Sequence, residues 1–79
     1  MQASERMVAV RISYKKLWMR LLERDIKKAS LRREVGLSAG TWTKLNKGEE
    51  VSLSILLRIC DYLNCDIGDI CEAVRTDKN

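Results

Sequence analysis

Hydrogen-bond donors between residues 27 and 47 are the side chains best suited to chemistry in this chain of 79 residues. Lysines stand at both ends of the stretch, and hydroxyl groups and one more lysine lie between them. Among these donors are Lys27, Lys28, Ser38, Thr41, Thr43, Lys44 and Lys47. Ammonium groups bind phosphate oxygens, and hydroxyl and ammonium donors can reach the edges of bases. These residue types therefore favour binding to a nucleic acid.

Catalytic and metal-binding patterns are missing from the sequence. There is no histidine, no inward pair of carboxylates and no base beside a cysteine, so no enzymatic activity is expected. Cys60, Cys65 and Cys71 have four and five residues between them, which matches no common zinc pattern. We expect no cofactor and no small-molecule ligand, and we expect Cys60 and Cys71 to be small core residues.

The cysteines and the hydropathy also bear on the location of the protein. Three cysteines are an odd number, and no apolar run resembles a signal peptide, so we expect a cytoplasmic protein with reduced thiols. No apolar run is long enough to cross a bilayer.

Charge is divided unevenly along the chain. Residues 1–47 contain 12 Lys and Arg against 4 Asp and Glu, whereas residues 48–79 contain 3 against 7. A basic half suits a polyanionic partner, although a charge excess can also serve only to keep a surface solvated.

One local pattern recurs five times: an apolar residue, a cap position, and a second apolar residue four positions after the cap. This spacing marks the start of a helix. It predicts helices over residues 14–24, 28–35, 39–47, 53–64 and 67–74. The cap positions are Ser13, Lys27, Ser38, Ser52 and Asp66.

The second and third of these helices form the centre of the chain. Leu31 and Val35 belong to one apolar set, Gly36 interrupts it, and Trp42 and Leu45 belong to the next. A glycine turn this short makes two helices cross sharply, so that the second can enter a DNA major groove.

Lys27 offers no acceptor to the N–H groups that begin the helix over 28–35. A DNA phosphate could bind there, drawn by the helix dipole together with Lys27 and Lys28. Alternatively, water solvates this end, or Asp25 caps a helix that begins earlier.

The two last helices differ in their expected roles. Over residues 53–63 only Ser54, Arg58 and Asp61 are polar, so this helix should be central or part of an interface. The helix over 67–74 should close the core with apolar residues on its inner face. These are Ile67, Ile70, Cys71 and Val74.

The ends of the chain complete the predicted organisation. Residues 8–12 alternate weakly and suit a short strand, and no second strand is expected. We therefore divide the chain into an N-terminal arm over 1–12, a domain over 13–75 and a tail over 76–79.

Four segments together resemble the Cro/repressor-type helix-turn-helix family, also called the xenobiotic-response-element family. They are SYKKLWMRLLE at 13–23, LRREVGLSAGTWTKL at 31–45, KGEEVS at 47–52 and LLRICDYLNCDIGDI at 56–70. The resemblance implies an all-α, five-helix, lambda-repressor-like DNA-binding domain, here with a short N-terminal strand. It also implies that the third helix is the recognition helix.

The resemblance assigns the recognition residues by position. Those expected at DNA are Ser38, Ala39, Gly40, Thr41, Thr43 and Lys44, with phosphate contacts at Lys27, Lys28 and Lys47. Trp42 and Leu45 should point inward. Ala39 and Gly40 stand where family members often carry base-reading amides, so we expect modest sequence discrimination or the use of DNA shape. Glu49 and Glu50 stand where a phosphate contact would need basic residues.

Two functions follow from this sequence. The first is a transcriptional regulator that binds double-stranded DNA. The second is a protein-interaction module, such as an antitoxin or anti-repressor, that keeps the fold and uses its apolar surface.

We also expect a homodimer, because the predicted strand has no partner within the chain. Pairing about a two-fold axis would supply the missing edge and would place two recognition helices about one DNA turn apart. The expected interface residues are Val8, Val10, Ile12, Ile55 and Tyr62. Alternatively, the N-terminal segment folds back over its own helices.

Overall fold

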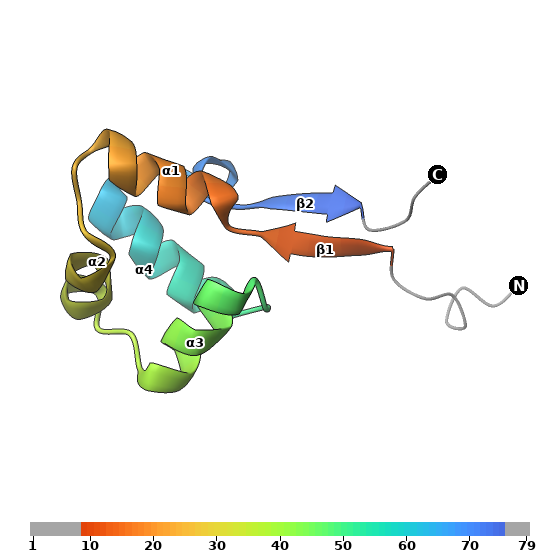
Figure 1. Ribbon diagram of the computed structural model, residues 1–79, viewed down its shortest axis with the longest axis horizontal. Helices are drawn as coiled ribbons and strands as arrows, with labels where there is room; N and C mark the ends of the chain where they lie inside the picture. The colour runs from red at the N-terminus through yellow and green to blue at the C-terminus, as the bar shows by residue number, and fades with distance from the viewer. Residues whose placement is uncertain (1–8, 76–79) are drawn as a thin grey trace, which may run out of the picture.

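The computed structural model describes residues 9–75. Within this range four α-helices are followed by a turn of 3-10 helix, and a strand lies at each end (Figure 1). The elements are β1 (Val10–Ser13), α1 (Lys15–Glu23), α2 (Lys28–Val35), α3 (Ala39–Lys47), α4 (Leu53–Leu63), η2 (Ile67–Asp69) and β2 (Glu72–Arg75). None of the helices in this range is long and apolar enough to cross a membrane.

Helix ends lie where the sequence supplies caps. Ser38 Oγ accepts the N–H of Thr41 at 3.2 Å, and Ser52 Oγ accepts the N–H of Ile55 at 3.3 Å. Gly36 and Gly48 end α2 and α3 at φ values of 76° and 75°, which a residue with a Cβ adopts only with strain. The predicted cap of the first helix is wrong by one residue, because Tyr14 is its N-cap and Ser13 ends β1.

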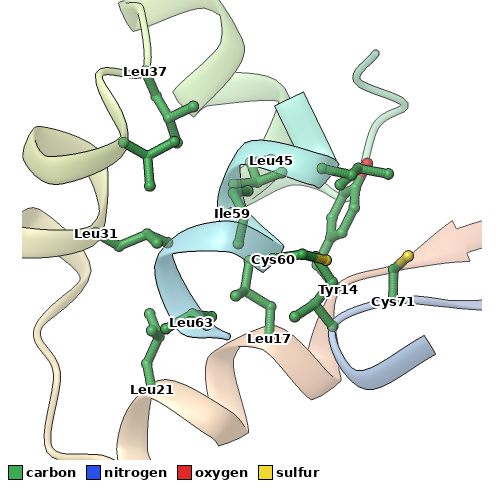
Figure 2. Packing of buried hydrophobic residues seen from close by; sticks show 13 residues of the cluster. Tyr14, Leu17, Leu21, Leu31, Leu37, Leu45, Ile59, Cys60, Leu63 and Cys71 are labelled. Carbon is green, nitrogen blue, oxygen red and sulfur yellow. The ribbon is translucent and has the colours of Figure 1, made fainter. Parts of the chain in front are cut away.

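The core forms around α4. Leu56, Ile59, Cys60 and Leu63 are buried on its inner face. Figure 2 shows Leu31 of α2 pointing toward Ile59, with Leu17 and Leu21 of α1 on another side of the same helix. The central position predicted for this helix is therefore confirmed.

Arginines connect α4 to the helices on either side. Arg58 of α4 donates to the carbonyl oxygens of Val35 and Gly36 at the end of α2. Arg24, just after α1, donates to the carbonyl of Leu63 at the end of α4. A cation at the carboxyl end of a helix satisfies free carbonyls and complements the helix dipole.

The prediction that no second strand exists is wrong. β2 pairs antiparallel with β1 in the register Val10↔Arg75, Arg11↔Val74, Ile12↔Ala73 and Ser13↔Glu72. The two strands form a ribbon that extends away from the helices (Figure 1). The N-terminal strand thus finds its partner within its own chain, so the argument that a second copy must supply one fails.

The prediction of a fifth α-helix over residues 67–74 is also wrong. The fold is mostly helical with a small sheet, and the predicted all-α class is corrected accordingly. Residues 67–69 form one 3-10 turn, in which the Ile70 N–H bonds the Ile67 carbonyl at 3.0 Å. Asp66 and Asp69 form a capping box at its start. The chain then extends into β2. Ile70 and Cys71 are buried as expected, whereas Val74 is only half-buried, on the ribbon.

Candidate nucleic-acid interface

The outer face of α3 carries the side chains expected to face DNA. Ala39, Gly40, Thr43 and Lys44 are exposed, and Leu45 is buried on the opposite side. An ideal Cβ on Gly40 would meet nothing within 4 Å, so no packing within the described part of the chain requires a glycine there. The outer face of α3 thus has small residues at Ala39 and Gly40 and is open to an approaching partner.

Ser38 and Thr41 are largely occupied by the cap of α3. Besides accepting the Thr41 N–H, the Ser38 hydroxyl donates to Thr41 Oγ1 at 3.2 Å. Thr41 is half-buried. Their hydroxyls hold the first turn of α3, which leaves Thr43 and Lys44 as the more available donors.

The start of α2 is open, as the sequence predicted. Lys27 is the N-cap in an extended conformation, and no side chain caps this end. Asp25 lies before it at a φ of 59° and does not cap the helix, so the alternative of an earlier start capped by Asp25 is wrong. Lys27 is exposed.

Lys28 lies next to Lys27, yet its surroundings differ. Its Nζ lies 4.0 Å from the centre of the Trp18 ring and 5.8 Å from that of Trp42. The same Nζ donates to Asn46 Oδ1. Trp18 and Trp42 meet edge to face, with ring centres 6.1 Å apart and an interplanar angle of 86°. We call Lys28, Trp18, Trp42 and Asn46 the tryptophan clamp.

The loop after α3 combines a cation with two acids. Lys47 in the last turn is exposed, and so are Glu49 and Glu50. The Tyr14 hydroxyl donates to the Glu49 carbonyl at 2.8 Å and fixes this loop against the start of α1. The backbone at Glu49, the first residue of the acidic pair, is therefore held in place by Tyr14.

Ion pairs are concentrated away from α3. Lys16 of α1 lies 3.7 Å from Glu72, and Arg20 lies 3.5 Å from Asp69. In residues 9–75 none of Lys27, Lys44 and Lys47 forms such a pair. Part of the basic N-terminal half is thus neutralised by the acidic C-terminal half. The lysines of residues 9–75 without such an ion pair are Lys15 on α1, Lys27 and Lys28 at the start of α2, and Lys44 and Lys47 on α3.

The expected dimer residues lie in two places. Val10 and Ile12 share one face of the ribbon, whereas Ile55 and Tyr62 lie on α4. Ile12 and Ile55 pack against the core of their own chain, and the Tyr62 residue is 37% exposed. Val8 lies outside the described residues.

Two exposed leucines were missed by the sequence argument. Leu53 and Leu57 of α4 are 63% and 52% exposed, although only three polar positions were expected at the surface of this helix. They are four residues apart and lie on one flank of α4. A helical wheel that used the polar residues as the limits of the exposed face would not find them.

Two of the cysteines are core residues. Cys60 and Cys71 are each 7% exposed, as expected, and Cys65 is half-buried. Burial raises the pKa of the Cys60 thiol to about 11, with smaller contributions from Cys65 and Asp66. Burial also raises the pKa of Cys71, against an opposing effect of Lys16.

Residues 16–76 match the model of the Cro/C1-type helix-turn-helix DNA-binding domain. The chain belongs to the Cro/C1-type helix-turn-helix family. A crystal structure of the transcriptional regulator VanUg has 55% sequence identity to the chain and a TM-score of 0.85, and the match covers 87% of this chain and 92% of that one. No curated protein matches significantly. Membership of the Cro/C1-type family confirms the prediction of a DNA-binding protein rather than an enzyme.

Proposed function

We propose that the protein is a transcriptional regulator of the xenobiotic-response-element type, which acts in the cytoplasm on double-stranded DNA. Its α3 enters the major groove, and Thr43 and Lys44 approach the bases. The observation that carries the proposal is the exposed outer face of α3, flanked by lysines without carboxylate partners among the described residues. The family match and the likeness to a transcriptional regulator support it.

Phosphate contacts rest on Lys27, the open start of α2 and Lys47. Free N–H groups, the positive end of the helix dipole and an exposed ammonium all attract a phosphate oxygen at this point. Because Ala39 and Gly40 offer no donor to a base edge, sequence selection depends on Thr43, Lys44 and the shape of the DNA.

We also propose that the protein binds DNA as a homodimer. The support is no longer a strand without a partner. It is now the outer edge of β1, because β1 pairs with β2 alone in the described sheet. A two-stranded ribbon alone is only marginally stable in water. Pairing of two β1 edges would join two ribbons, and Tyr62 with the exposed leucines of α4 would add apolar surface to cover.

Binding to a mixed-sequence 30-base-pair duplex at several salt concentrations tests the function. Lys27→Ala and Lys47→Ala should each weaken binding and lower the salt slope by about one unit, because each removes one phosphate contact. Lys44→Ala should instead change the preference among sequences selected from a random pool.

Lys16→Ala is the matched control, because it removes the same charge from a lysine that contacts Glu72 and the Gly68 carbonyl instead of facing DNA. Its salt slope should equal that of the native protein. Absence of binding by the native protein at low salt would contradict the proposal and favour a protein-interaction module.

A further inference from the structure

We propose that Lys28 is a positioning residue, which sets the orientation of the recognition helix through the tryptophan clamp and does not bind a phosphate. The proposal rests on the proposed function of α3 as the DNA-reading helix. It assigns different roles to two adjacent lysines.

The recognition helix is held by few buried groups. Leu45 is the one fully buried side chain of α3, and Leu37 is the buried residue in the turn before it. Trp42 is the next inward residue of α3, and it is only half-buried. The contacts made by Trp42 and its neighbours therefore help to fix the angle of α3.

The clamp joins three helices at this weakly buried side. Trp18 belongs to α1, Lys28 to the first turn of α2, and Trp42 and Asn46 to α3. The Lys28 ammonium lies over the Trp18 ring at 4.0 Å, a favourable cation–π distance. Its bond to Asn46 and its 5.8 Å distance to the Trp42 ring connect the same charge to α3.

Asn46 is itself held in place. Its Nδ2 donates to the Trp42 carbonyl at 2.8 Å, so its Oδ1 is directed to Lys28. Lys28 is exposed, but the Asn46 oxygen and the Trp18 ring hold its ammonium between α1 and α3. Lys27, one residue earlier, is exposed and has no ion pair within residues 9–75, so it is available to contact DNA.

The experiment compares Lys28→Met with Lys27→Met, which removes the same charge from the adjacent position. Both tryptophans of the chain belong to the clamp, so fluorescence reports on it directly and without DNA. Lys28→Met should change the emission spectrum, because a charge beside an indole alters its excited state, and Lys27→Met should not. Lys28→Arg keeps a cation that stacks on an aromatic ring, and it should restore the native spectrum.

Two duplexes then test the consequence for DNA. One is selected from a random pool by the native protein, and the other has a mixed sequence. Lys28→Met should keep the native salt slope and lose about five-fold or more of the preference for the selected duplex, whereas Lys27→Met should lower the slope by about one unit and keep that preference.

The outcomes separate the two proposals. An unchanged emission spectrum in Lys28→Met, or a salt slope lowered as much as in Lys27→Met, overturns the positioning role. Failure of the native protein to bind either duplex overturns the proposed function, while the fluorescence comparison still tests the clamp.

Discussion

Lys27 and Lys28 have the same side chain at adjacent positions, and their surroundings differ in kind. Both residues are exposed, but Lys27 lies at an uncapped helix start, whereas the Lys28 ammonium lies over the Trp18 ring and donates to the Asn46 amide oxygen. The sequence could not separate them, because Trp18 and Trp42 are 10 and 14 residues from Lys28 and only the fold brings them together. Thr41 is a similar case, since its hydroxyl serves the cap of α3. The donors most available to DNA are therefore fewer than the residue types suggested.

Cys60 supplies a prediction at the scale of one residue. Burial raises the pKa of its thiol to about 11 from an ordinary value of 9.0, so between these values the folded chain holds a proton that the unfolded chain has lost. Stability is fully retained below pH 9 and falls as the pH rises toward 11. Urea unfolding of the native protein and Cys60→Ala at several pH values measures this.

The variant should begin from a lower stability, because it removes a buried sulfur, and should show a shallower decline above pH 9. Part of the decline should remain in the variant, since burial also raises the pKa values of Cys71 and Tyr14. An equal decline in both proteins would contradict the effect assigned to Cys60.

At the scale of elements, α3 contains Gly40, although the packing of the described residues leaves room for a Cβ at this position. Gly40→Ala should stabilise the protein by about 0.5–1 kcal/mol, because alanine has the higher helix propensity and its Cβ meets open space. The midpoint of thermal unfolding, followed by circular dichroism, should rise by a few degrees, on the order of 4 °C.

Gly48→Ala, at the C-cap of the same helix, is the opposing control. Its Cβ also meets open space, yet its φ of 75° is strained for alanine, so its midpoint should fall. If Gly40→Ala also lowered the midpoint, the helical conformation described for residue 40 would be wrong. If it raised the midpoint but weakened DNA binding, a close approach of DNA at Gly40 would explain the glycine.

Helices with strong local signals were predictable from the sequence. The bounds of α2 and α3 agree with the predicted 28–35 and 39–47, because Lys27, Gly36, Ser38 and Gly48 mark their ends. The spacing of Asp66 and Ile70 also marked a helix start, but a single 3-10 turn satisfies it equally well. β2 was missed because its partner lies about 60 residues earlier, and a four-residue strand carries little local signal.

At the scale of the whole molecule, the proposed dimer is the main prediction. Sedimentation at micromolar concentration should give twice the chain mass of 9.1 kDa. Val10→Glu should reduce this to the monomer, because a charge on an edge strand opposes edge-to-edge pairing, while its position opposite Arg75 keeps the ribbon within the chain. Ala73→Glu is the control, since it adds the same charge to the same face of the ribbon on the other strand, and it should stay dimeric.

A native protein of monomer mass would reject the dimer at these concentrations. Dissociation by Ala73→Glu but not by Val10→Glu would place the contact at the edge of β2. In either case the ribbon itself belongs to one chain, which the alternation of Val8, Val10 and Ile12 alone could not reveal.

The pairing of Val10 with Arg75 bears on the order in which the chain folds. The ribbon joins the first and last described elements, so its formation closes a loop that includes all four helices. Closing so long a loop has a large entropic cost, and only a few strand hydrogen bonds offset it. The contacts within α2 and α3 are local and have a much smaller cost of this kind. The helices should therefore assemble around α4 first, and the ribbon should form late and open early, as a unit whose stability is lower than that of the helical core.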